Sequence, residues 1–175
     1  MAMAEDARVA RGPHDKHAAH ARIVERLHMN AEDVTRLVAG LSDADLARRT
    51  VPEKWSVKEL VCHLDRIHEV FDERLEAMLG QDNPALPSYE PDGDEGFAAR
   101  VQRPTADTLA SFLLRRERLI ARLEELRPAD WHRPGRHPEY PGYDVHFCVE
   151  YLSHHEGHHL YQMFQRRVPF GPIPH

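Results

Sequence analysis

Apolar residues recur at three- and four-residue steps through four long segments of this chain, which is the pattern of amphipathic α-helices. The expected helices cover residues 17–41, 56–79, 105–126 and 145–167. Ser56 followed by Glu59 forms a capping box at the start of the second helix, and Pro128 and Pro169 stop the third and fourth. Since no segment has a convincing strand pattern, the sequence predicts an all-α fold, a four-helix bundle.

The connection between the second and third helices is long. It runs from Gln81 to Arg103 and is rich in Pro, Gly and Asp. Antiparallel neighbours in a bundle are usually joined by about 2 to 8 residues. We therefore expect a crossover that leaves these two helices parallel. Residues 1–13 are expected to form a disordered tail, followed by a single domain over residues 14–175.

Charge and composition restrict the class of protein. The chain has 23 Lys and Arg against 29 Asp and Glu, and a net charge of −6 does not suggest a nucleic-acid-binding surface. It lacks a signal peptide pattern and any stretch approaching 18 apolar residues. Cys62 and Cys148 are too few for a secreted disulfide framework. We expect a cytoplasmic protein that binds neither nucleic acid nor membranes, and a homodimer by the base rate for soluble proteins.

The segment Ser153–Gln162 carries four histidines, which form two pairs with a spacing of four residues. The apolar stripe of this helix consists of Val145, Cys148, Leu152, His155, His159 and Met163. His155 and His159 should therefore face the core, where imidazoles four residues apart can bind one ion. A buried polar group without a partner costs about 1 to 3 kcal/mol, and a metal would satisfy both rings. His154 and His158 form a competing pair on the wetter face of the helix.

A third ligand has to come from another helix. His63 is the best candidate, because it lies beside Leu60 and Ile67 and so borders the apolar stripe of the second helix. His68 faces away from this position. The further histidines in residues 14–20 are interpreted as the polar start of the first helix.

A glycine within the histidine-bearing helix and the loop that precedes this helix could both shape a binding site. Gly157 lies inside the helix, where glycine costs about 1 kcal/mol relative to alanine, and it would permit either close helix packing or the approach of a ligand. The loop over residues 128–142 contains Trp131, His137 and Tyr140. Such a loop either caps the core or lines the mouth of a site.

Two motifs resemble the DinB/YfiT-like proteins, which are four-helix bundles with a three-histidine metal site. The first is WSVKELVCHL at residues 55–64, and the second is HEGHHLYQ at residues 155–162. The order of the helices and the long middle connection fit the same layout. The resemblance implies that His63, His155 and His159 bind a divalent metal ion. Zinc and nickel both suit imidazole ligands.

The resemblance also bears on activity. Some members of the family are thiol S-transferases that use bacillithiol, mycothiol or glutathione, and some are isomerases of thiol-dependent pathways. This chain is accordingly expected to transfer a small thiol to electrophilic or xenobiotic substrates. Glu156 and Asp65 are candidate catalytic residues, and Tyr161 and Gln162 are candidates for orienting a ligand or the substrate. Asp65 and Gln162 are explained equally well as helix surface, and a non-catalytic metal-binding or stress-response scaffold stays open.

A third interpretation is a metal-dependent hydrolase, because residues 155–159 formally match the H-E-x-x-H motif with Glu156 as general base. Only 16 residues follow His159, and they contain no acidic residue and one histidine, His175. The usual downstream ligand is therefore missing, and Gln162 stands where the metzincin extension needs glycine. An all-helical domain also lacks the edge strand that aligns a peptide substrate.

Overall fold

The computed structural model describes the backbone of residues 13–174 and the side chains of residues 18–174. The predicted tail over residues 1–13 lies outside this range except for Pro13, where the first helix begins. The α-helices in the described range are α1 (Pro13–Val38), α2 (Asp43–Ala47), α3 (Val57–Gly80), α4 (Glu95–Val101), α5 (Thr105–Glu124) and α6 (Val145–Arg167). Two 3₁₀ turns, η1 (Asp130–His132) and η2 (Val168–Phe170), flank α6.

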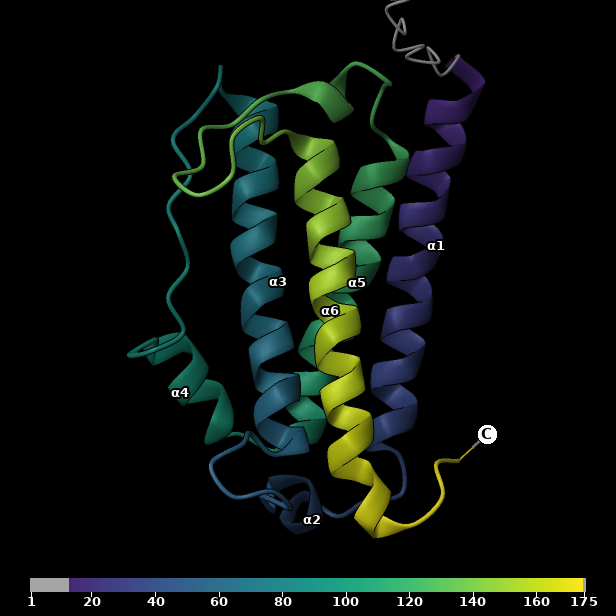
Figure 1. Ribbon diagram of the computed structural model, residues 1–175, viewed down its shortest axis with the longest axis vertical. Coiled ribbons are helices and arrows are strands. Elements are labelled where there is room, and N and C mark those ends of the chain that lie inside the picture. Colours follow the sequence, from purple (N-terminus) through teal and green to yellow (C-terminus); the bar gives the residue numbers. More distant parts are fainter. Residues whose placement is uncertain (1–12, 175) are drawn as a thin grey trace, which may run out of the picture.

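The four long helices form a four-helix bundle with the predicted crossover (Figure 1). Helices α1 and α6 run in one direction, and α3 and α5 run in the other (Figure 1). Around the bundle, α6 packs against α1 and α3, and α5 completes the ring by packing against the same two helices. The connection after α3 returns along the outside of the bundle and carries α4 (Figure 1). Because the connection leads back to the end of the bundle where α3 begins, α5 starts at that end and runs parallel to α3 (Figure 1).

Local capping explains where the helices begin. The Ser56 hydroxyl accepts a hydrogen bond from the Glu59 amide, and the Glu59 carboxylate accepts one of 2.8 Å from the Ser56 amide, so the predicted capping box is present. Asp144 caps α6 in a similar way. Helices α2 and α4, of 5 and 7 residues, were not predicted from the sequence, because such short segments do not complete an amphipathic repeat.

The core consists of two apolar clusters separated by a buried polar layer. One cluster includes Leu27, Phe71, Leu75, Leu123 and Leu152, and the other includes Val34, Leu60, Leu64, Phe112 and Met163. Each long helix contributes one residue to the polar layer, at a position between these residues of the two apolar clusters. These four residues are Asn30, His68, Arg116 and Glu156. The bundle therefore has buried charge at half height.

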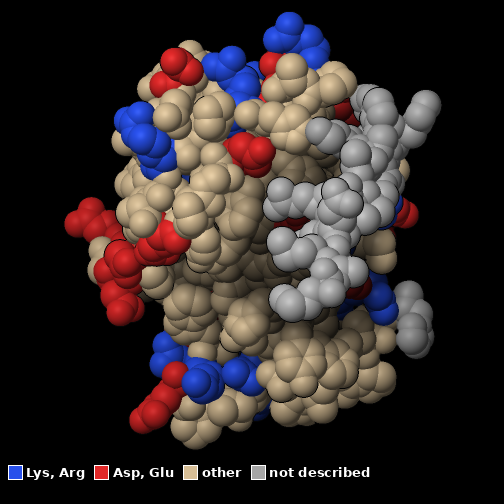
Figure 2. Space-filling model, turned by 45° about the horizontal axis from the view of Figure 1, so that its top comes forward, with Lys and Arg blue, Asp and Glu red and all other residues tan. Residues whose placement is uncertain are grey.

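Surface charges are mixed on the face shown in Figure 2, where acidic and basic groups alternate around an uncharged centre. None of the described helices combines the length and the apolar character needed to cross a membrane. The described residues form no β-strand, although two isolated bridges, Ala85–Arg136 and Pro134–Asp144, fix the loop before α6. This loop is thereby held across the ends of α3 and α6.

Candidate metal centre

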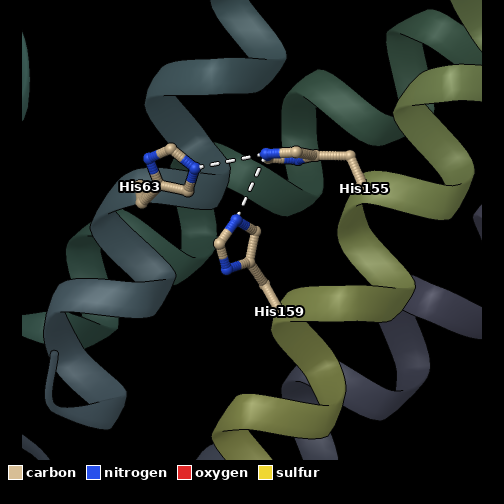
Figure 3. Close-up of side chains that lie close together, drawn as sticks. All are labelled: His63, His155 and His159. Atoms are coloured by element: carbon tan, nitrogen blue, oxygen red, sulfur yellow. Dashed lines mark hydrogen bonds between the residues drawn. The ribbon is translucent and has the colours of Figure 1, made fainter. Parts of the chain in front are cut away.

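Three histidine rings from two helices converge at one point in the groove between α3 and α6 (Figure 3). His63 comes from α3, and His155 and His159 come from successive turns of α6. The Nε2 atom of His155 lies 3.4 Å from Nε2 of His63 and 3.2 Å from Nε2 of His159. Among the described residues, these side chains are the group of three potential ligands that come within 4.8 Å of one another.

The spacing of the nitrogen atoms fits a metal ion. Zinc binds imidazole nitrogen at about 2.0 to 2.1 Å, so two ligands of a tetrahedral ion are separated by about 3.3 Å. The His63–His155 and His155–His159 separations, 3.4 and 3.2 Å, bracket this value, and the ligand atoms of all three residues lie within 4.8 Å of one another. The donor set therefore fits one divalent ion bound through three Nε2 atoms.

Burial keeps these histidines neutral. Burial, together with a smaller effect of the neighbouring His159, lowers the pKa of His63 and of His155 to about 3. Burial also lowers the pKa of His159, although the hydrogen bond to Gln162 opposes this shift. Since a metal binds the unprotonated ring, all three side chains are ready to act as ligands near neutral pH.

Neighbouring side chains set the orientation of the rings. The Gln162 Oε1 atom lies 2.9 Å from Nδ1 of His159, so Nδ1 carries the proton and the lone pair of Nε2 faces the other two rings. Trp55 packs against His63 with ring centroids 4.9 Å apart, and Tyr151 stacks on His155. The structure thus brings Gln162 to the cluster as an orienting group.

A pocket of about 310 Å³ opens beside the histidines. Its other walls include Trp55, Phe71, Arg74, Tyr89, Tyr140 and Tyr151. The loop before α6 was expected either to cap the core or to line the mouth of a site, and it does both. His137 and Tyr140 line the pocket, whereas Trp131 is buried in the core and stacks on His20. The volume is at the lower end of the range for small-molecule sites.

Arg74 and Tyr89 were not identified from the sequence as pocket residues. Arg74 could have been found, because it follows His63 by 11 residues and so returns to the same helix face.

Comparison with known proteins agrees with this arrangement. A family model described as the DinB superfamily matches residues 26–163. The chain belongs to the DinB superfamily. "Uncharacterized protein YuaE" of Bacillus subtilis (strain 168) is 26% identical over 142 residues, which cover 71% of this chain and 84% of YuaE. The structure of YfiT from Bacillus subtilis, described as a probable metal-dependent hydrolase with an unusual four-helix bundle topology, superposes with a TM-score of 0.78. At 18% identity over 95% of this chain and 94% of YfiT, that likeness shows the fold.

Neither candidate acid of this DinB-superfamily protein lies at the histidine cluster. Glu156 is fully buried, forms an ion pair with Arg116 and accepts a hydrogen bond of 3.0 Å from Asn30 Nδ2. Asp65 is also buried, and its carboxylate accepts a hydrogen bond of 2.6 Å from Arg100 Nε. Each residue on a helix is turned by about 100° from the one before it, so neighbours of a ligand face elsewhere. Both carboxylates form ion pairs with arginines of other helices, which argues against the predicted catalytic role of either acid.

Other predicted positions also point away from the cluster. Tyr161 is 63% exposed and is not among the residues that line the pocket beside the histidines. A Cβ atom at Gly157 would meet nothing within 4 Å, which supports neither close packing nor a ligand at that residue. His154 and His158 are exposed and bond to Arg26 and Gln162, respectively. The competing pair therefore lacks a third described ligand.

The remaining potential ligands are engaged in the core. His68 is fully buried, with Nδ1 lying 3.2 Å from the Asp72 carboxylate and Nε2 accepting from Arg116. Cys62 and Cys148 are buried free thiols, and burial raises their pKa to about 11 and about 12. A protonated, buried thiol is a core residue rather than a ligand.

Proposed function

We propose that this protein is a metal-dependent enzyme in which His63, His155 and His159 hold one divalent ion at the base of a pocket for a small molecule. The convergence of three neutral imidazoles, two of them buried and that of His155 half-buried, at the wall of an open pocket carries this proposal. Structural zinc sites are usually closed by four protein ligands, whereas catalytic sites use three and keep a position open. No fourth ligand from the described residues joins the three histidines.

The reaction we propose is transfer of a low-molecular-weight thiol to an electrophile. A divalent ion held by the three histidines would lower the pKa of a coordinated thiol and supply a thiolate near neutral pH. The thiolate sulfur forms a bond to the electrophilic carbon, the leaving group departs with its electron pair, and the thiol proton passes to solvent. Trp55 and Tyr151 provide apolar walls that would hold the electrophile and exclude water.

The positions of the acidic side chains favour a thiol over water as the nucleophile. Glu156 and Asp65 are committed to Arg116 and Arg100, and Glu139 is the acid that lines the pocket among the described residues. The Glu139 carboxylate accepts a hydrogen bond of 3.0 Å from Ser88 on the exposed rim. A thiolate attacks without a general base, whereas metallohydrolases of the H-E-x-x-H type use a carboxylate beside the metal to accept the proton of the attacking water.

Hydrolysis is the second candidate, because YfiT is described as a probable metal-dependent hydrolase. The pocket and the three histidines would also accommodate that reaction, with water in place of the thiol. Analysis of products separates the two, since only transfer gives an adduct that contains the thiol sulfur.

The first test is metal content, measured by mass spectrometry on protein made without a polyhistidine tag or a nickel column. We expect about one divalent ion, zinc or nickel, per chain. His155→Ala should lose it, because one of the three ligands is removed. His154→Ala is the matched control, since this adjacent histidine is exposed and lies outside the cluster. Retention of the metal in His155→Ala, or its equal loss in both variants, would reject the site.

The second test is product formation by the metal-containing protein. We would incubate it with bacillithiol, mycothiol or glutathione and with 1-chloro-2,4-dinitrobenzene, and follow the thioether by mass spectrometry. A parallel incubation with aryl esters measures hydrolysis. Thioether formation that is lost in His155→Ala and kept in His154→Ala supports transfer. Ester cleavage alone would support hydrolysis, and stoichiometric metal with neither product would indicate a non-catalytic scaffold.

A further inference from the structure

Arg74 is a buried arginine without an acidic partner. The described arginines that are at least nine-tenths buried are Arg74, Arg100, Arg116 and Arg167. Arg100 and Arg116 form ion pairs with carboxylates, and Arg167 donates to three backbone carbonyls. Arg74 donates a hydrogen bond of 2.7 Å to the Pro87 carbonyl and interacts with the Tyr143 hydroxyl, both of which are neutral groups, and its Nε has no partner. Arginine stays charged in proteins, so this cation is kept in the pocket wall without a counterion.

The position of Arg74 relates it to the histidines. It follows His63 by 11 residues on α3, which corresponds to about 16 Å along the axis and a rotation of only about 20°. Its Cζ atom lies 5.1 Å from the ring centroid of Phe71, one turn nearer to His63. The guanidinium therefore lies over the ring of a residue that stands between Arg74 and His63 along α3. Arg74 and His63 line the same cavity.

No described carboxylate neutralises this charge. Glu139, which lines the same pocket, bonds to Ser88 and does not form an ion pair with Arg74. The Nδ1 atoms of His63 and His155, also in the pocket wall, are likewise buried without a hydrogen-bond partner. Buried polar groups are normally paired, and an unpaired charge is costlier than an unpaired neutral group. The missing partner of Arg74 is therefore expected in the molecule that occupies the pocket.

We propose that Arg74 binds the anionic head group of a small organic acid whose apolar body lies against Phe71, Tyr140 and Tyr151. A planar guanidinium matches a carboxylate, sulfonate or phosphate. The aromatic walls bury the remainder of the ligand. The proposal deepens the proposed function, because it gives that reaction a substrate class: one of the two reactants carries an anion at the end away from its reacting atom.

The test is equilibrium binding of 3-phenylpropionate, benzenesulfonate and phenyl phosphate to the full chain, measured by calorimetry. The neutral probe 3-phenylpropionamide has the same body as 3-phenylpropionate and lacks its charge. We expect at least one acid to bind saturably, and roughly 10- to 100-fold more tightly than to Arg74→Gln, the range for a charge-assisted hydrogen bond. The amide should bind more weakly than the carboxylate. Arg122→Gln is the matched control, because this exposed α5 arginine lies outside the pocket.

Three results would overturn the proposal: no saturable binding of any acid, equal affinity for 3-phenylpropionate and its amide, or equal affinity of wild type and Arg74→Gln. The comparison of acid with amide uses wild-type protein, so it holds even if Arg74→Gln does not fold. The probes have neither a thiol nor a reactive carbon, so the readout does not depend on catalysis. If glutathione displaces the bound acid and its diethyl ester does not, the thiol is the reactant whose anionic group binds Arg74. If neither displaces the acid, the electrophile is the reactant that carries the anionic group.

Discussion

Replacing Glu156 by glutamine should destabilise the fold without removing the metal. Glu156 has 0% exposure and pairs with Arg116, which is 2% exposed. Glutamine preserves the volume of the side chain, so the main effect is an uncompensated cation in the core. Breaking a buried ion pair in this way costs about 3 to 5 kcal/mol, a large share of the 5 to 15 kcal/mol typical of a domain.

Urea unfolding followed by circular dichroism measures this loss. With a slope of about 2 kcal/mol per molar urea, the midpoint should fall by roughly 1.5 to 2.5 M. Arg116→Met should also destabilise, because it leaves the carboxylate unpaired. The double variant removes both charges, so it should lose clearly less stability than the sum of the two single variants. Glu150→Gln is the matched control on α6, since this partly exposed acid pairs with His146 near the surface. Its effect should stay within about 0.5 kcal/mol.

The two interpretations of Glu156 give opposite results. If it stabilises helix packing, Glu156→Gln unfolds at lower urea concentration and still contains one metal ion per chain. If it is the general base of an H-E-x-x-H enzyme, the variant keeps its stability and loses activity. Unfolding indistinguishable from wild type would therefore refute our reasoning.

Three further predictions concern other parts of the chain. Gly135→Ala should cost about 1 to 3 kcal/mol in thermal or urea unfolding, because its Cβ would lie 2.5 Å from a buried leucine side chain, whereas Gly157→Ala should stabilise α6 by about 0.5 to 1 kcal/mol. Hydrogen bonds from Thr105 hold the pKa of Asp43 at about 2, below its ordinary 3.8, so its carboxylate stabilises the fold above about pH 4. The difference in unfolding free energy between wild type and Asp43→Asn should therefore be full at pH 7 and shrink between about pH 4 and pH 2, and a difference independent of pH would contradict this. The two buried cysteines, whose pKa values are raised to about 11 and about 12, should not react with a disulfide reagent at pH 8 until the protein unfolds, and rapid labelling of the native protein would refute their burial.

Much of the fold could be predicted because its signals are local. The apolar spacing predicted residues 145–167 as a helix, and α6 has those bounds. The expected helix over residues 56–79 is α3 shifted by one residue, with its capping box in place. The length of the middle connection predicted the crossover. Helix α4 was missed, because about two turns packed on the outside of the bundle leave little periodicity to detect.

The sequence by itself determined the helices and which histidines share a face, because both follow from the 3.6-residue repeat of a single segment. It also singled out His63, His155 and His159, which the structure brings together in one cluster. Only the tertiary structure decided what each polar side chain meets, since those partners come from segments far apart in the chain. Glu156 is the neighbour of His155 in sequence, yet its partner is Arg116 of α5. Arg74 is a routine helix residue in the sequence, and packing of α3 against the loop before α6 turns it into an unpaired cation in the pocket wall.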